Sequence, residues 1–427
     1  MEVINAGVNG INGGTMSHLE IPRLPTTRDI DITGRKVFMR IDINVPMDPD
    51  TGEILDDRRI RTHASFIRKL VEDYRPALVL ASHQGRPGDS DFTSMEKHAE
   101  LLSKYTGINI RYIPDVIGPK ALEEINNLKP GEILLLDNLR LLSEEVLEAP
   151  PERQALTIMA RRLSSVINIY VNDAFATAHR SQPSIVGLPL LMPSCIGPLF
   201  EREIEAVKKV FGSGESPRIY VLGGSKVREL LRVIENLMRN KLADRILTTG
   251  LLAHLFLVAK GVNIGTENMK ILEEKGVLSL VPRARYILLR GAPVETPVDL
   301  KVEVNGDVRN TYIGEVRGVA KDIGENTVQI YSDLIKDARI IVMRGPAGVI
   351  EDERFRDGTL RILDAVYSSN AFTLIAGGHL ASMVNESKLS NRIHVSTGGN
   401  ALLLFLSGEE LPALKALELS AKMFLGW

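Results

Sequence analysis

The sequence predicts two Rossmann-like, doubly wound α/β domains of similar size, joined by a hinge helix. Short apolar runs rich in β-branched residues recur along the chain, and an amphipathic helical stretch follows most of them. Several of these runs are almost continuously apolar, which is typical of strands covered on both faces of a parallel sheet. A proline-interrupted segment and a helix divide the runs into two series.

The first series predicts five strands, at 36–42, 77–82, 109–113, 132–137 and 167–172. The second series predicts six, at 218–222, 244–249, 285–289, 339–343, 372–376 and 392–396. Because strands alternate with helices, the connections should be right-handed crossovers and the sheets parallel.

The boundary between the two domains is expected on the helix at 200–211, near residue 205. Four prolines interrupt the preceding run 181–200, and GSGESP at 212–217 ends the helix. The expected organisation is a flexible tail at 1–20, a first domain at 21–199, a hinge helix and loop at 200–216, a second domain at 217–406 and a terminal segment at 407–427. Met16 is a candidate for the biological start.

Composition excludes several classes of function. The 427 residues carry 52 Lys and Arg against 54 Asp and Glu, a net charge of −2, which argues against a general nucleic-acid binder. No uncharged run is both long enough and free of proline, so no membrane span is expected. The single cysteine, Cys195, excludes an internal disulfide and a Cys-cluster metal site. A reducing, cytoplasmic location fits this cysteine usage.

Charged and amide side chains follow the strands of the first series. Carboxyl ends of parallel strands share one edge, where ligands bind in such sheets. Four arginines gathered there would repel one another unless an anion compensates them, and the guanidinium fork suits carboxylate and phosphate. A small, multiply anionic ligand is therefore expected, against the alternative of solvated surface arginines with Asp partners. The candidate residues are Asp42, Asn44, Arg59, His83, Arg86, Arg140 and Arg180.

Glycines follow the strands of the second series instead. Glycine lets a phosphate approach the backbone, and a helix N-terminus supplies amide donors. Lys226 begins a helix, where its amine can reach a phosphate oxygen. Five such strand ends favour a nucleotide groove over simple tight turns. They are LGGSK (222–226), TTGLLA (248–253), RGPAGVIE (344–351), AGGH (376–379) and STGGN (396–400).

Two common nucleotide motifs are absent from the sequence. Without G-x-x-x-x-G-K-[ST] the chain is not a P-loop NTPase, and without G-x-G-x-x-G a dinucleotide dehydrogenase is poorly supported. The eight histidines show no metal-ligand spacing. We therefore expect no protein metal site, and any Mg²⁺ should be carried by the phosphates of the nucleotide.

At this point the motifs resemble those of phosphoglycerate kinase, from about Ile21 to the C-terminus. The matching segments are RIDINVP (40–46), SHQGRP (82–87), DNLR (137–140), YVNDAFATAHR (170–180), LGGSKV (222–227), TPVD (296–299), DIGENT (322–327), GPAGVIE (345–351) and STGG (396–399). The resemblance implies phosphoryl transfer between 1,3-bisphosphoglycerate and Mg-ADP, giving 3-phosphoglycerate and Mg-ATP by hinge-bending closure, in glycolysis or gluconeogenesis.

The resemblance also implies a division of roles. Asp42, Asn44, Arg59, His83, Arg86, Arg140 and Arg180 fall on positions that bind the triose substrate. Gly223, Gly224, Lys226, Glu351, Gly377, Gly378 and His379 fall on positions that bind ATP or ADP, with Glu351 on the ribose. Arg59 and Lys226 are the expected catalytic residues, which meet the transferred group from opposite domains. The segment 407–427 should return to the first domain. We expect a monomer, with a dimer left open.

Four residues depart from the commoner pattern of that family. Leu230 replaces a second lysine, so one phosphate contact is lost, and Arg344 replaces an asparagine and adds a charge beside the phosphates. His379 replaces the aspartate of GGGD, as in archaeal-like members, and Asn400 replaces a third glycine. His379 could donate to a phosphate, contact Mg-bound water or cap a helix. These departures keep an alternative open, a non-catalytic scaffold that binds triose phosphate or nucleotide.

Overall fold

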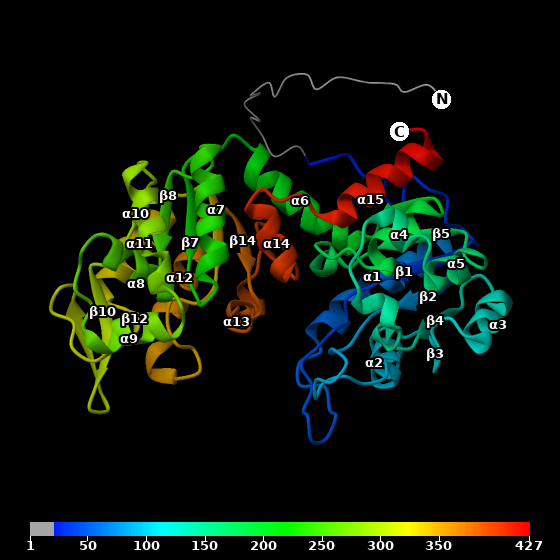
Figure 1. Cartoon of the computed structure of the whole chain (residues 1–427), viewed down its shortest axis with the longest axis horizontal. Helices are drawn as coiled ribbons and strands as arrows, with labels where there is room; N and C mark the ends of the chain where they lie inside the picture. The colour runs from blue at the N-terminus through cyan, green and yellow to red at the C-terminus, as the bar shows by residue number, and fades with distance from the viewer. Residues whose placement is uncertain (1–20) are drawn as a thin grey trace, which may run out of the picture.

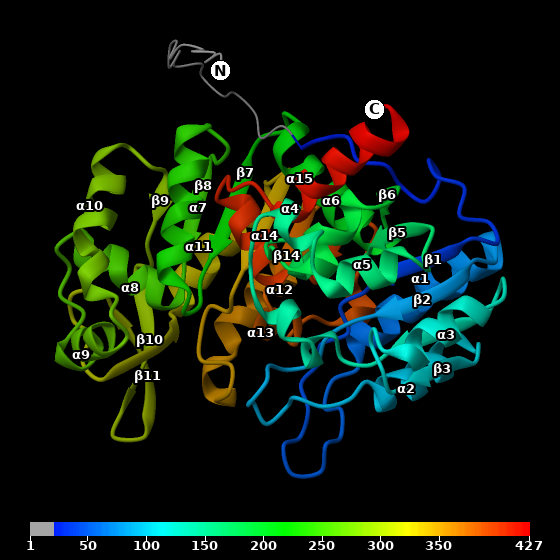
Figure 2. The same ribbon diagram turned by 45° about the vertical axis from the view of Figure 1, so that its right-hand side comes forward.

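The computed structural model describes residues 21–427 and shows two lobes joined by one helix, α6 (Pro198–Gly212) (Figures 1 and 2). Each lobe contains a parallel sheet, as the sequence predicts, and each of these sheets has six strands. The expected tail at 1–20, with Met16, lies outside the described residues. No helix within 21–427 has both the length and the apolar character that crossing a membrane requires.

The first lobe has the strand order β3-β4-β2-β1-β5-β6. Alternate residues of its strands enter two separate hydrophobic clusters, so apolar side chains cover both faces of the sheet. The strands are β1 (Lys36–Arg40), β2 (Ala77–Ala81), β3 (Ile110–Ile113), β4 (Ile133–Leu136), β5 (Ile169–Asn172) and β6 (Ser194–Ile196). The helices are α1 (Arg58–Tyr74), α2 (Glu96–Thr106), α3 (Pro119–Asn127), α4 (Pro151–Gln154) and α5 (Ile158–Ser164).

The second lobe has the order β15-β14-β13-β7-β8-β9, with a small antiparallel sheet β11-β10-β12 beside it. Its strands are β7 (Arg218–Leu222), β8 (Arg245–Thr248), β9 (Val294–Glu295), β10 (Asp299–Val304), β11 (Asp307–Tyr312), β12 (Val319–Ile323), β13 (Ile340–Arg344), β14 (Phe372–Ala376) and β15 (Ile393–Val395). Its helices are α7 (Val227–Arg239), α8 (Gly250–Ala259), α9 (Thr266–Glu274), α10 (Val281–Leu289), α11 (Glu325–Lys336), α12 (Asp357–Ser368), α13 (Gly378–Ala381) and α14 (Gly399–Leu406).

The strand predicted at 285–289 is wrong, because these residues form the end of α10. Ala284 and Ile287 are buried while Tyr286 and Leu289 are 56% and 87% exposed, and this three-residue spacing belongs to a helix. The edge strand beside β8 is instead β9. The antiparallel sheet and the short strand β6, which lies within the proline-interrupted segment, were not predicted.

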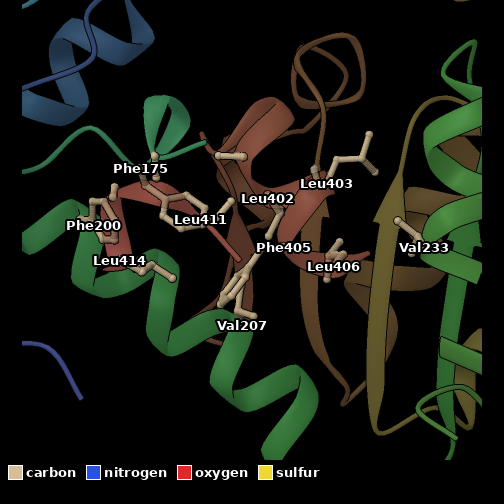
Figure 3. Packing of buried hydrophobic residues seen from close by; sticks show 14 of the residues in the cluster. Phe175, Phe200, Val207, Val233, Leu402, Leu403, Phe405, Leu406, Leu411 and Leu414 are labelled. Carbon is tan, nitrogen blue, oxygen red and sulfur yellow. The ribbon is translucent and has the colours of Figure 1, made fainter. Parts of the chain in front are cut away.

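Aromatic side chains from three segments pack together where the lobes meet (Figure 3). Phe175, which follows β5, contacts Phe200 of α6 edge to face with ring centroids 5.1 Å apart, and Phe405 of α14 lies 6.5 Å from it. Helix α15 (Pro412–Ser420) lies against the first lobe, where the Ser420 hydroxyl donates to the Met192 carbonyl at 3.0 Å. The hinge region is thus a continuous apolar core rather than a flexible linker.

Candidate functional site

The strand order of each sheet reverses at one point, and the predicted site residues gather there. In the first lobe the reversal lies between β1 and β5, because β2, β3 and β4 lie on one side of β1 and β5 and β6 on the other. In the second lobe it lies between β7 and β13. Crevices at such switch points, beyond the carboxyl ends of the strands, are where open α/β sheets bind ligands.

Asp42 and Arg59 form the centre of the first-lobe site. Arg59, in the first turn of α1, donates to the Asp42 carboxylate. Burial would raise the pKa of Asp42, but Arg59 and neighbouring cations lower it to about 2. The Asp42 backbone N–H donates to His63 Nε2 at 3.2 Å, and His63 Nδ1 lies 3.3 Å from the buried Asp173 carboxylate. His63 was not predicted, although its position four residues after Arg59 on α1 places it on the same helix face.

Arg40 supports His83 from within the lobe and was also absent from the predicted set. It is only 1% exposed, and its Nε donates to the Ser184 hydroxyl at 3.1 Å while Nη1 donates to the Ile41 carbonyl. Its Nη2 lies 3.0 Å from His83 Nδ1. Burial, followed by the charge of Arg40, lowers the pKa of His83 well below its ordinary value. Because arginine only donates, His83 Nδ1 is the acceptor and the Nε2 proton is free to donate to a ligand.

Several arginines lie close enough to one another to repel. Burial, followed by the charge of Arg180 and those of other arginines including Arg86, lowers the pKa of Arg140 to about 10. Arg140 donates to the Gly85 carbonyl, and the Gly85 N–H donates to the Asn44 side chain at 3.0 Å. The structure therefore brings all seven predicted first-lobe residues to one edge of the sheet, where they form a strongly cationic surface.

A cavity of about 640 Å³ occupies the matching edge of the second lobe. Six of the seven predicted nucleotide residues line it, namely Gly224, Lys226, Glu351, Gly377, Gly378 and His379. Arg344 and Asn400, two of the departures from the family pattern, line it as well. Leu251, Ile271, Leu300 and Val319 provide apolar walls, so the cavity combines polar and apolar surfaces.

Glycine is required where the chain segments of this cavity cross. Gly224 has φ +83° and Gly345 has φ +76°, and a Cβ on Gly345 would lie 2.2 Å from the Gly223 carbonyl oxygen. Gly223 does not line the cavity, and a Cβ there would lie 2.0 Å from the Thr249 hydroxyl. Its small size brings the ends of β7 and β8 together behind the site.

Lys226 lies at the start of α7 and donates to the side-chain oxygen of Asn400 on α14. Burial, followed by the charge of Arg344, lowers the pKa of Lys226. Leu230, one turn further along α7, is fully buried in the hydrophobic core. Asn400 thus holds the lysine in place, while Leu230 contributes to packing and offers no polar group.

His379 lies at the exposed rim of the cavity with Glu351. Its Nδ1 is 3.4 Å from a Glu351 carboxylate oxygen, and both side chains are largely exposed. A protonated His379 would pair with Glu351. A helix-capping role has no support here, because no side-chain hydrogen bond caps α13.

The two sites belong to facing surfaces of the lobes. Arg58, at the start of α1, donates across to the Ala381 carbonyl of α13 at 2.9 Å. Behind this contact, Glu203 of α6 accepts from the Thr397 N–H at 2.7 Å and from the Ser396 hydroxyl at 2.6 Å. These contacts connect helices of the first lobe and the hinge to the loops that carry the nucleotide residues.

Comparison with known proteins gives one consistent result. The family model for phosphoglycerate kinase matches residues 27–409. The phosphoglycerate kinase of Sulfurisphaera tokodaii is 54% identical over 94% of this chain and 98% of that protein, and the one from Saccharolobus solfataricus is 53% identical over 93% and 97%. A crystal structure of phosphoglycerate kinase from Pyrococcus horikoshii superposes with a TM-score of 0.86 at 40% identity, covering 93% of this chain and 99% of that one.

Proposed function

This chain belongs to the phosphoglycerate kinase family and functions as a phosphoglycerate kinase, and we propose on this premise that it transfers a phosphoryl group from the acyl phosphate of 1,3-bisphosphoglycerate to ADP. The reverse reaction forms 1,3-bisphosphoglycerate from 3-phosphoglycerate and ATP. The supporting observation is the complementary pair of sites, a cationic edge on one lobe and a glycine-lined cavity on the other.

In this proposal the first lobe binds the triose. The clustered arginines Arg86, Arg140 and Arg180 neutralise its phosphate, and a phosphate bound there would relieve their mutual repulsion. His83 donates through Nε2 because Arg40 occupies Nδ1. Asp42, ionised at neutral pH, holds Arg59 at the edge until the substrate arrives.

The second lobe binds the nucleotide with its phosphates at Lys226 and its ribose near Glu351. Mg²⁺, when bound, neutralises charge on the phosphates. Lys226, Arg344 and several glycines line the cavity, and cations and glycine backbone fit the oxygens of phosphate groups rather than a bare metal ion. The residues present therefore fit a nucleotide that brings its own Mg²⁺.

Transfer requires the lobes to close, because each holds one reactant. Phosphoryl transfer needs in-line placement and positive charge on the equatorial oxygens, and little covalent chemistry from the protein. Arg59 from one lobe and Lys226 from the other would provide that charge only in the closed form. Cationic contacts of this kind contribute on the order of 10³–10⁵ in rate. Closure also excludes water, which would otherwise take the phosphoryl group.

A coupled assay tests the proposal directly. The purified chain is given 1,3-bisphosphoglycerate and ADP, with and without Mg²⁺, and ATP formation is followed. We expect rapid Mg-dependent ATP formation that Lys226→Ala reduces by orders of magnitude, while Lys208→Ala, an exposed lysine of the hinge helix, retains it. Binding of both ligands without ATP formation would favour the non-catalytic scaffold.

The proposal includes a monomer, because one chain carries both halves of the site, and a cytoplasmic location, which the single cysteine fits. Light scattering should give a mass near 47.1 kDa. A value twice as large would indicate a dimer.

A further inference from the structure

Arg344 occupies the centre of the second-lobe switch point. It is the last residue of β13, where its backbone pairs with Leu222 of β7 and Ala376 of β14. Its carbonyl accepts from the Gly223 N–H at 2.7 Å. The side chain lines the 640 Å³ cavity, and a Cβ on Gly377 would lie 2.8 Å from its Nη1. The guanidinium is therefore held against the glycine loop of β14 in the cavity wall.

The Arg344 side chain has no partner among the groups of residues 21–427. It is only 8% exposed, yet it makes no hydrogen bond or ion pair within this part of the chain, and its Nε is buried without an acceptor. The charged groups that act on it are Lys226, which repels it, and Glu229, which attracts it without touching it. A buried, unpaired cation is costly, so its retention calls for an anion that the chain itself does not provide.

Arg40, which is more deeply buried than Arg344, shows what a structural arginine looks like in this protein. It is 1% exposed and has three partners, Ser184, the Ile41 carbonyl and His83. Arg344 is also buried and has none of these contacts. Packing alone therefore does not account for Arg344.

We propose that Arg344 binds a phosphate of the nucleotide together with Lys226. This inference rests on the proposed nucleotide site and names one residue of that site. Leu230 is fully buried among apolar side chains, so helix α7 offers Lys226 alone at this end. Arg344 reaches the same region from the end of β13, and its planar fork can bind two oxygens of one phosphate.

The test is calorimetric binding of ADP and of adenosine to Arg344→Gln, Arg344→Lys and the matched control Arg228→Gln. Arg228 is an exposed arginine in the first turn of α7 that does not line the cavity. We expect Arg344→Gln to weaken ADP binding by about 10- to 100-fold and adenosine binding by less than about twofold. Arg344→Lys should fall between wild type and Arg344→Gln, and Arg228→Gln should match wild type for both ligands.

Thermal unfolding without nucleotide provides the second measurement. Because Arg344→Gln removes an uncompensated buried charge, its melting temperature should equal or exceed that of the wild type. Unchanged ADP affinity, an equal loss for ADP and adenosine, or a lowered melting temperature would each overturn the proposal. The role of Arg344 is decided by ADP binding and not by turnover. Wild-type protein that binds ADP but forms no ATP would therefore refute the proposed function and still allow the Arg344 variants to be tested.

Discussion

Replacing Glu203 with alanine should destabilise the protein strongly, because Glu203 joins helix α6 to the second lobe. Glu203 is fully buried, and its Oε1 accepts from the Thr397 N–H at 2.7 Å and from the Thr397 hydroxyl at 3.0 Å. Its Oε2 accepts from the Ser396 hydroxyl at 2.6 Å and lies 3.2 Å from His394 Nε2. All of these partners lie just before α14.

The magnitude follows from the donors that the substitution leaves without a partner. Three donors lose their acceptor at roughly 1–1.5 kcal/mol each, so Glu203→Ala should lower the free energy of unfolding by about 3–5 kcal/mol. Glu203→Gln keeps the size and one oxygen, and should lower it by about 1 kcal/mol. Because the carboxylate joins the two lobes, Glu203→Ala should also separate unfolding into two transitions.

The assay is urea unfolding followed by circular dichroism, with Glu205→Ala as the matched control on the exposed side of α6. Burial would raise the pKa of Glu203, but His394, Ser396 and Thr397 lower it below the ordinary value of 4.5. Its contribution is therefore present above pH 4.5 and lost as the pH falls through the lowered pKa. The reasoning is refuted if Glu203→Ala and Glu205→Ala unfold at the same urea concentration at pH 7.

Three further predictions concern Arg59, Arg58 and two buried histidines. Arg59→Ala should lower kcat by about 10³–10⁵ in the coupled assay with an unchanged dichroism spectrum, and a loss below tenfold would contradict its role. Arg58→Ala removes the hydrogen bond to the Ala381 carbonyl, which lies between the two lobes. Small-angle scattering should therefore give a larger radius of gyration for Arg58→Ala than for the control Arg61→Ala, and equal radii would count against this contact. Burial lowers the pKa of His98 and of His254 to about 4, so the unfolded chain takes up protons at a higher pH than the folded protein. The free energy of unfolding should therefore fall as the pH drops from 6.5 to 4, by up to about 3 kcal/mol for each histidine. The double variant His98→Gln, His254→Leu should flatten the stability profile measured by urea unfolding over that range, and an unchanged slope would refute the assignment.

The central strands, and the kind of residue that follows each of them, can be predicted from local composition alone. The runs of β2, β7 and β13 are largely apolar, and a strand covered on both faces requires such residues. Parallel strands place their carboxyl ends at one edge. The residues that follow each strand therefore predict the cationic edge around Arg59 and the glycine-lined edge around Lys226.

The tertiary structure decided which of these side chains are paired. Arg40 and Arg344 both end central strands, and nothing local to either explains why, within residues 21–427, one side chain has three partners and the other has none. Glu203 and Ser396 are 193 residues apart in sequence, and His63 on α1 depends on Asp173, which follows β5. Residues 285–289 likewise form part of a helix because the rest of the fold buries one face of it, at Ala284 and Ile287. Strand composition is a local property, whereas the neutralisation of a buried charge depends on groups brought near it by folding, and those groups can come from anywhere in the chain.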